Sequence, residues 1–153
     1  MPKPPLSAGR RPAGPMKTLQ VKSELRELDR IRKFVRRRLR DLELSEEDIY
    51  KVDISLVEMC TNIMRYAYPG SRGDITIRTW HEDARLYLEL RDDGIAFDPR
   101  TVKKPSMREM LSGERMGGLG IFLARRLMDG FDYRRQDAQN ILTMYKKAAA
   151  RKA

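Results

Sequence analysis

The 153-residue sequence predicts one α+β domain, a two-layer α/β sandwich in which about three helices cover one face of a mixed sheet. Three stretches repeat apolar residues at helical spacing, and about five short runs alternate apolar and polar residues with the period of a strand. The two kinds of segment follow one another in mixed order. Hydrophobic residues make up 41% of the chain and charged residues 35%, which provides a core and a strongly solvated exterior.

The first half of the chain predicts an edge strand and two helices. The run KTLQV at 17–21 alternates as a strand does, and a helix is expected over 23–40 with its first residue, a serine, as N-cap. Ser45 opens the second helix, with Asp48 three residues later as in a capping box, and the Pro-Gly pair at 69–70 ends it. The apolar stripes are Leu25, Leu28, Ile31, Val35 and Leu39, and then Ile49, Val52, Leu56, Cys60, Ile63 and Ala67.

The second half predicts two hairpins separated by a long loop and a third helix. In each hairpin, two alternating runs are joined by a polar tetrapeptide. Residues 95–116 are polar without a clean period, and a loop of that length is usually a functional lid or a disordered segment. The glycine cluster at 117–120 then starts a helix with the sequence IFLARRLMD. The four expected strands cover 74–80, 85–91, 131–136 and 141–147.

Composition also divides the chain into a folded part and two tails. Residues 1–15 are rich in Pro and Gly and almost free of apolar side chains, so we expect them to be disordered. The folded domain is expected over 16–147, and 148–153 form a second, basic disordered tail.

The net charge of +10 comes entirely from residues 1–40. Residues 1–40 contain 13 Lys and Arg against 3 Asp and Glu, whereas residues 41–153 contain 19 of each. A nucleic-acid-binding domain is expected to carry basic residues on its working surface. Because the charges of residues 41–153 balance, direct nucleic-acid binding is not expected.

Several classes of protein are excluded by what the sequence lacks. No window approaches 18 uninterrupted apolar residues, and the N-terminus has no apolar signal segment, so neither a membrane span nor a secretory signal is expected. Cys60 is the single cysteine and His81 the single histidine, which leaves no internal disulfide and no Cys/His zinc cluster. These features indicate a cytoplasmic protein.

A carboxylate, an amide and a guanidinium share one face of the second predicted helix. Glu58 and Asn62 are four residues apart, so their side chains lie one turn from each other, and Arg65 continues the same face. Together they could hold a hydrated Mg²⁺ beside a phosphate chain. An isolated pattern of this kind is more often an ordinary solvated stripe.

Asp92 stands at the end of a strand-like run, in the segment LRDDGIAFDP. An aspartate there can accept a hydrogen bond from an exocyclic amine such as that of adenine, while Gly94 lets the backbone approach the ring. A plain Asp-Gly turn is the alternative.

The sequence Gly117-Gly118-Leu119-Gly120 stands at a predicted helix start. Exposed backbone N–H groups and the helix dipole favour phosphate at such a place. A flexible N-cap is the alternative, and the P-loop pattern occurs nowhere in the chain.

Taken together, the three motifs resemble the ATP boxes of the Bergerat-type fold shared by histidine kinases, gyrase-type ATPases and heat-shock chaperones. Within that group the sequence is most similar to the small anti-sigma-factor serine-protein kinase family. The phrases EMCTNIMRYAYPG, LRDDGIAFDP and GGLGIFLARRLMDGFDY stand in the family's order, and the likeness runs from about Met16 to Lys147. The resemblance implies a histidine-kinase-like ATPase domain over 16–147.

The resemblance also implies roles for residues of the second helix. Asn62 corresponds to the asparagine that binds magnesium, and Glu58 to the carboxylate that acts as general base toward the attacking hydroxyl. Arg65 lies among the nucleotide-binding residues. Tyr66 departs from the family, which commonly has histidine at that position.

The remaining implied roles concern the base and the phosphates. Asp92 corresponds to the aspartate that reads adenine, with Gly94 beneath the base. The cluster at 117–120 corresponds to the residues next to the phosphates, and about 98–117 to the ATP lid. Thr143 corresponds to a threonine that supports adenine recognition.

By resemblance, the protein is an ATP-dependent protein-serine kinase and anti-sigma factor with ATP and Mg²⁺ as cofactors. It would phosphorylate a small anti-sigma-factor antagonist and hold a sigma factor, in a partner-switching system that controls transcription, and it could form a homodimer. Two alternatives stay open: a non-catalytic module in which ATP only gates partner binding, and a stand-alone catalytic domain of the histidine-kinase type. Retention of Glu58 argues against the first, and the position of His81 at a predicted strand turn argues against the second.

Overall fold

The computed structural model describes residues 14–112 and 118–148. Most of the two expected tails, together with Gly117 and the end of the expected lid, lies outside the described residues. The elements are β1 (Lys17–Lys22), the 3-10 turn η1 (Leu25–Glu27), α1 (Leu28–Leu39), α2 (Glu46–Tyr66), β2 (Asp74–Glu82), β3 (Arg85–Asp92), the 3-10 turn η2 (Pro99–Thr101), α3 (Met107–Ser112), α4 (Gly118–Leu127), β4 (Gly130–Gln136) and β5 (Gln139–Lys147).

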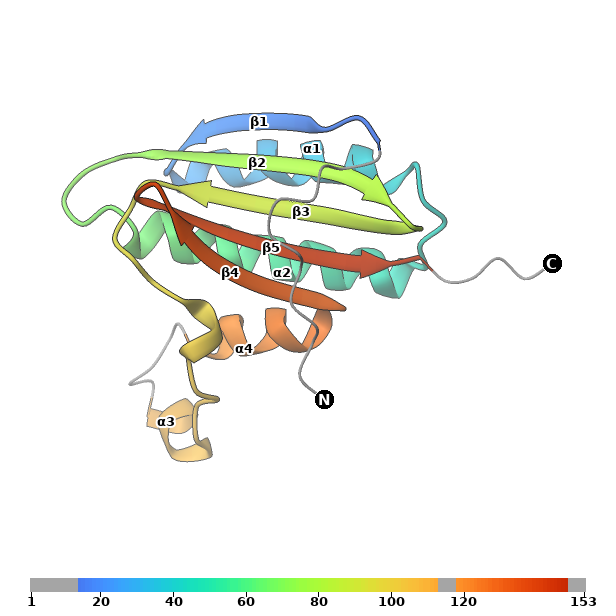
Figure 1. Cartoon of the computed structure of the whole chain (residues 1–153). Helices are drawn as coiled ribbons and strands as arrows, with labels where there is room; N and C mark the ends of the chain where they lie inside the picture. The colour runs from blue at the N-terminus through green and yellow to red at the C-terminus, as the bar shows by residue number, and fades with distance from the viewer. Residues whose placement is uncertain (1–13, 113–117, 149–153) are drawn as a thin grey trace.

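The five strands form one sheet in the order β1-β2-β3-β5-β4. Helices α1, α2 and α4 lie on one face of it (Figure 1), so the predicted α+β sandwich is confirmed. The sheet itself is not mixed, because all four pairings between neighbouring strands are antiparallel. Strands β3 and β4 do run in the same direction, but β5 lies between them and prevents a parallel pair.

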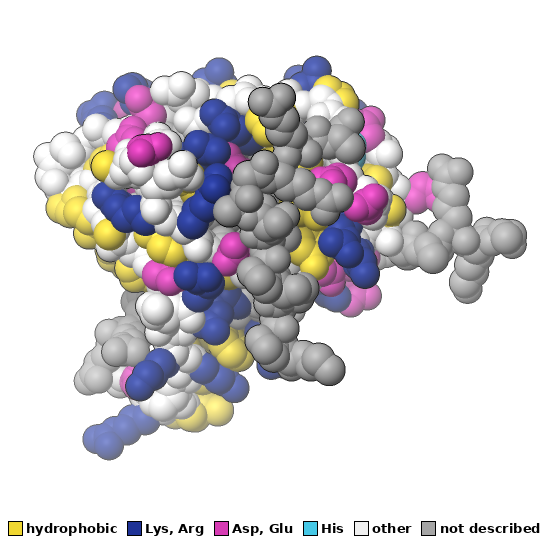
Figure 2. Space-filling view, viewed as in Figure 1, with side chains coloured by type: hydrophobic (Ala, Val, Ile, Leu, Met, Phe, Trp, Pro, Cys, Tyr) yellow, Lys and Arg dark blue, Asp and Glu magenta, His cyan; other side chains and the backbone are white. Residues whose placement is uncertain are grey.

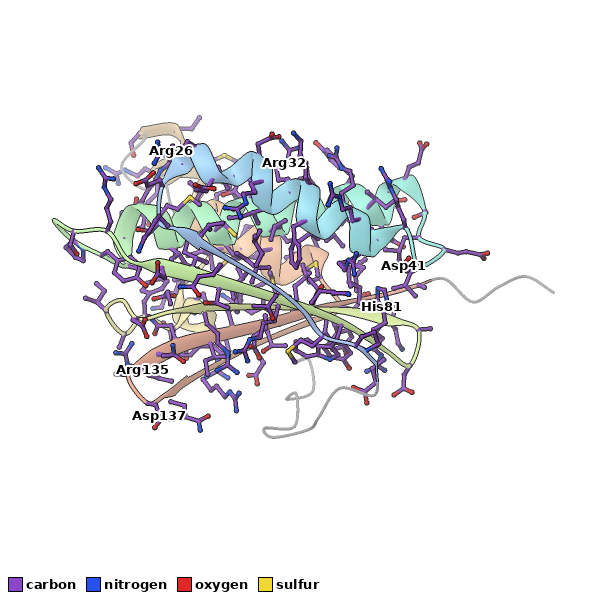
Figure 3. All side chains as sticks on the ribbon, turned by 90° about the horizontal axis from the view of Figure 1, so that it is seen from above. Arg26, Arg32, Asp41, His81, Arg135 and Asp137 are labelled. Carbon is purple, nitrogen blue, oxygen red and sulfur yellow. The ribbon has the colours of Figure 1, made fainter. Side chains whose placement is uncertain are left out.

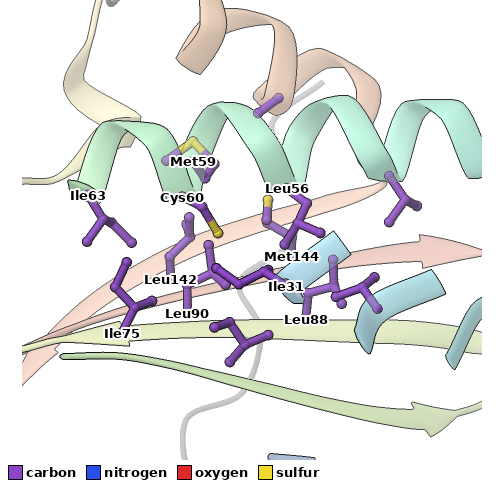
Figure 4. Close-up of a cluster of buried hydrophobic side chains, with 14 of the residues drawn as sticks. Ile31, Leu56, Met59, Cys60, Ile63, Ile75, Leu88, Leu90, Leu142 and Met144 are labelled. Atoms are coloured by element: carbon purple, nitrogen blue, oxygen red, sulfur yellow. The ribbon is translucent and has the colours of Figure 1, made fainter. Parts of the chain in front are cut away.

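The core fills the space between the helices and the sheet. Leu56, Cys60 and Ile63 on α2 point toward Leu90 on β3 and Leu142 on β5, as Figure 4 shows. The thiol of Cys60 is completely buried, and this burial raises its pKa to about 12. The prediction that Cys60 belongs to the helix stripe is therefore confirmed.

Both hairpins close with tight turns of two residues. Asp83 and Ala84 have φ values of 51° and 59°, and Asp137 and Ala138 have 52° and 61°. Two consecutive positive φ angles match the right-handed twist of the strands that they join. The strands consequently extend further into the expected tetrapeptide loops than the sequence pattern indicates.

The two predicted N-caps have different outcomes. Ser45 caps α2 as expected, since its Oγ accepts a hydrogen bond from the N–H of Asp48 at 3.1 Å. Ser23 does not cap a helix. Its Oγ instead accepts from the N–H of Gly73 at 3.1 Å, and the chain passes through η1 before α1 begins.

The surface carries both signs of charge. On the side of the molecule seen in Figure 2, basic and acidic side chains are interspersed, in keeping with the balanced charge of residues 41–153. None of the helices in the described ranges is both long and apolar enough to cross a membrane.

Candidate functional site

An apolar cavity lies between α2 and the ends of β3 and β5. Its apolar walls come from residues of all three elements, among them Met59, Ile63, Leu90 and Leu142. Its polar groups are few, and the principal ones are Asn62, Asp92 and Asn140. Apolar walls with a few convergent polar groups are typical of a ligand site.

A wider groove continues from this cavity toward α4. Segment 101–103 forms one wall of the groove, and Gly118 and Ile121 of α4 form another. Asn62, Tyr66 and Phe97 line both the cavity and the groove, so the two hollows share a border. The molecule therefore offers an apolar compartment that opens directly onto the start of a helix.

Asp92 lines the cavity and is only 5% exposed. Its Oδ1 accepts a hydrogen bond from the N–H of Gly94 at 2.9 Å and another from Asn140 Nδ2 at 2.9 Å. Burial raises the pKa of the Asp92 carboxyl above its ordinary value, and the bonds from Asn140 and Gly94 oppose that rise.

Gly94 allows the segment after β3 to pass close to the end of α2. A methyl group on Gly94 would lie 2.4 Å from the carbonyl oxygen of Ala67 and 2.5 Å from its Cβ, so only glycine fits. The next residue, Ile95, donates its N–H to that same carbonyl at 2.9 Å. This contact fixes the position of Asp92 relative to α2.

The residues predicted on α2 have different surroundings. Asn62 lies at the border of the two hollows, whereas Glu58 lies one turn earlier and lines neither. The carboxylate of Glu58 packs against Gly120 on α4, where an added methyl group would lie 2.0 Å from its Oε2. Arg65 is exposed and lines neither hollow.

The glycine cluster is described from Gly118 onward. A methyl group on Gly118 would lie 3.2 Å from Pro105 Cγ, which places the start of α4 beside the segment that follows η2. Leu119 is 38% exposed and does not line the groove. Gly120 is buried against Glu58.

Two arginines hold the first part of the expected lid in place. Arg125 on α4 donates from Nη1 to the carbonyl oxygen of Val102 at 2.6 Å. Arg100 bonds to the carboxylates of Asp98 and, at 2.8 Å, Asp132 on β4. The wall formed by 101–103 is thus attached to both neighbouring elements.

Thr143 lies outside the candidate site. In the register of β3 and β5 it is opposite Glu89, while Asp92 is opposite Asn140. Because side chains alternate along a strand, Thr143 points to the sheet face that the helices leave uncovered. Asn140, three residues earlier on β5, is the residue that lies beside Asp92.

Asn140 and Tyr133 were missed by the sequence reasoning. Tyr133 OH donates to Asn140 Oδ1 at 2.6 Å, and both residues line the cavity. The alternation of Asn140 with Leu142 and Met144 on β5 was a usable signal, but it required the register with β3.

His81 is far from this site. Figure 3 shows Arg135, which neighbours Asn140, and His81 near opposite ends of the sheet. The Nε2 of His81 lies 3.1 Å from the carbonyl oxygen of Arg38 at the end of α1. The ring therefore donates to a carbonyl at the end of α1, which also accepts from the N–H of Asp41 at 3.3 Å.

The donor set fits a magnesium ion that is held mainly by a ligand and water. Across the described ranges, no three His, Cys, Asp or Glu side chains gather into a metal site. Asn62 supplies an amide oxygen, with the carboxylate of Glu58 one turn away. Mg²⁺ prefers such hard oxygen donors and usually keeps several waters and phosphate oxygens as further ligands.

Comparison with known proteins places the chain in a family. Residues 21–146 match the family described as the histidine kinase-like ATPase domain. The serine-protein kinase RsbW of Bacillus cereus strain ATCC 10987 is 29% identical over 100 residues, which cover 63% of this chain and 62% of that protein. The RsbW of Bacillus thuringiensis strain Al Hakam is 28% identical over the same shares of the two chains. The match thus spans less than two thirds of these relatives.

Solved structures share the fold at lower identity. The structure of the RsbU and RsbW domains of Rv1364c from Mycobacterium tuberculosis superposes with a TM-score of 0.62 at 14% identity, covering 88% of this chain and 32% of that one. The catalytic domain of the histidine kinase ThkA gives a TM-score of 0.52 at 13% identity and covers 85% of this chain and 96% of that one.

Proposed function

The chain belongs to the histidine kinase-like ATPase domain family, and on that premise we propose that it is an ATP-dependent protein-serine kinase and anti-sigma factor. Its substrate would be a serine of a small antagonist protein, and its second partner a sigma factor. Relatives that match 63% of the chain carry the name serine-protein kinase, which supports this choice within the family.

The observation that carries the proposal is the position of Asn62. Asn62 lines both hollows: it shares the apolar cavity with Asp92, and it shares the groove with Gly118 at the start of α4. A nucleotide has the same order of parts: a flat apolar base, a sugar and a charged phosphate chain. The two hollows therefore suit a nucleotide whose base enters the cavity and whose phosphates point to α4.

The phosphate end has several sources of positive potential. The first N–H groups of α4 lack partners within the helix, and the helix dipole adds to their attraction for anions. Lys103 contributes a cation to the wall of the groove. Asn62 would hold Mg²⁺ together with the phosphates, and the ion would neutralise part of their charge.

Glu58 suits the role of general base because it lies on the phosphate side of Asn62. In the proposed reaction the serine hydroxyl attacks the γ-phosphorus, the bond to the β-phosphate oxygen breaks, and ADP leaves. The hydroxyl proton passes to the Glu58 carboxylate. No side chain in the described ranges forms a hydrogen bond with Glu58, so the carboxylate is free to accept this proton.

The proposal is tested by phosphotransfer from γ-labelled ATP to a candidate antagonist protein. We expect label on a serine, and Glu58→Gln should lower the rate by about 10²–10⁴-fold because the base is lost. Glu46→Gln, in the exposed first turn of the same helix, is the matched control and should keep the wild-type rate.

Other results would select the alternatives. Nucleotide binding and partner binding without any labelled product would indicate a non-catalytic module gated by ATP. A phosphohistidine product would indicate the histidine-kinase type. Unchanged phosphotransfer by Glu58→Gln would remove Glu58 from the mechanism.

A further inference from the structure

We propose that Asn140 determines the base specificity of the site: it occupies one oxygen of Asp92, so that the site selects adenine and rejects guanine. The inference rests on the proposed nucleotide binding and adds a residue that the motifs do not contain.

The hydrogen-bond partners of Asn140 fix the orientation of its amide. Its Oδ1 receives three donors, namely the Tyr133 hydroxyl at 2.6 Å, Arg135 Nη1 at 3.0 Å and the N–H of Phe97 at 3.4 Å. Its Nδ2 faces two acceptors, Asp92 Oδ1 at 2.9 Å and the carbonyl oxygen of Ile95 at 2.8 Å. A flipped amide would oppose donor to donor and acceptor to acceptor, so Asn140 must donate to Asp92.

The Asp92 carboxylate is therefore engaged on one side only. Oδ1 accepts from both Asn140 and Gly94. Among the described residues, none donates a hydrogen bond to Oδ2. Asp92 thus offers the cavity a single acceptor oxygen.

Arg135 reinforces this arrangement from β4. Its Nη1 donates to the carbonyl oxygen of Gly94 at 3.1 Å as well as to Asn140. Asp92, Asn140 and Arg135 are directly opposite one another across the three neighbouring strands β3, β5 and β4. Both Asp92 and Asn140 are buried, at 5% and 7% exposure, so water cannot easily replace a missing partner.

The two purines differ in what they offer to such a carboxylate. Adenine presents one exocyclic amine, which a single oxygen satisfies. Guanine presents two adjacent donors, N1–H and N2–H, which pair best with both oxygens of a carboxylate, and its O6 is an acceptor. With Oδ1 already engaged, guanine would bury one of its donors without a partner, which a buried site penalises.

The test compares two ligands that differ only in the base. Calorimetry gives the dissociation constants of ADP and GDP for the full chain, with Mg²⁺, in the wild type and in Asn140→Ala. We expect the wild type to prefer ADP, and Asn140→Ala to reduce the GDP-to-ADP ratio of dissociation constants by about tenfold, the value of one hydrogen bond. Gln139→Ala is the control, since Gln139 is outside the cavity and donates to Asp93 at 2.9 Å.

A second variant allows the test to be made even if Asn140→Ala does not fold. Tyr133→Phe removes one donor to Asn140 and leaves Asn140 itself in place, so it should move the ratio in the same direction by a smaller factor. A ratio that stays at the wild-type value in both variants would overturn the role of Asn140. Equal binding of ADP and GDP by the wild type would overturn the inference but leave the proposed function intact, whereas the absence of any nucleotide binding would overturn both.

Discussion

Glu58 on α2 and Gly120 on α4 are in direct contact, with the carboxylate in the space that any larger residue at position 120 would need. A methyl group on Gly120 would lie 2.0 Å from Glu58 Oε2. The position of the proposed base is therefore set by the packing of two helices, and not by a hydrogen bond.

Gly120→Ala should impair phosphotransfer more than nucleotide binding. The added methyl group must push the Glu58 carboxylate aside, and a misplaced catalytic group can cost about 10²-fold in rate. The measurement is the turnover rate together with the dissociation constant of ADP. Leu123→Ala changes an exposed residue further along the same helix and serves as control. A variant with the wild-type rate would show that the contact does not position the base.

Asp92→Asn should abolish ATP binding without unfolding the protein. The asparagine can still accept from Gly94 and Asn140 through its carbonyl oxygen, but its amide group would face the base amine with a second donor. Calorimetry with ADP checks the binding, and thermal unfolding checks the fold. Binding at the wild-type affinity would exclude Asp92 from base recognition.

The same variant should change how stability depends on pH. Burial raises the pKa of Asp92 in the folded protein above its ordinary value of 3.8. In the wild type, the contribution of the Asp92 carboxyl to the free energy of unfolding is therefore fully present below pH 3.8. This contribution is lost as the pH rises through the higher pKa of the folded state. Between these two pKa values, the free energy of unfolding of Asp92→Asn should rise relative to that of the wild type. Above the folded-state pKa, the difference between the two proteins should stay constant. Urea unfolding at a series of pH values measures the difference.

Gly94→Ala should destabilise the domain and weaken nucleotide binding together. The new methyl group would lie 2.4 Å from a backbone oxygen of Ala67, which cannot turn away as a side chain does. We expect a loss of about 1–3 kcal/mol in the free energy of unfolding, as for other overpacked sites. Urea unfolding and calorimetry with ADP measure the two effects, and a stable variant that binds ADP normally would contradict the close contact.

Arg125→Ala should weaken ATP binding while leaving the fold intact. The variant removes the bond from Arg125 Nη1 to the carbonyl oxygen of Val102, which holds one wall of the groove against α4. The control is Arg126→Ala, which changes an exposed neighbour on the same helix. An affinity equal to that of the control would show that this attachment does not shape the site.

Cys60 should react with thiol reagents only when the protein unfolds. The thiol is completely buried, and its pKa of about 12 leaves almost no thiolate at neutral pH. The reaction of an aromatic disulfide reagent with the native and the urea-unfolded protein measures this difference. Rapid reaction of the native protein would contradict the placement of Cys60 in the core.

Local patterns were sufficient to predict most of the fold. The apolar periods identified α1, α2, α4 and all five strands, because each element has one buried face. The pairing of strands was harder to predict, since it depends on which strand enters between two others. The insertion of β5 between β3 and β4 has no signal within either strand.

In the candidate site, too, local features could be predicted from the sequence, whereas features that depend on strand pairing could not. Glu58 and Asn62 share a helix, so their spacing alone places them one turn apart. Asn140 and Asp92 are 48 residues apart in the chain, and only the register of β3 and β5 brings them together. The resemblance assigns Thr143 to adenine recognition, but alternation along β5 places its side chain on the other face of the sheet.

An aromatic pair on the sheet face that the helices leave uncovered has a practical consequence. Trp80, the only tryptophan, stacks on Tyr87 with ring centroids 5.2 Å apart, and both lie on the side of the sheet opposite the cavity. Intrinsic fluorescence should therefore follow the integrity of the sheet and respond little to nucleotide. The protein thus contains its own optical probe of unfolding, which leaves a fluorescent nucleotide free to report binding in the same cuvette.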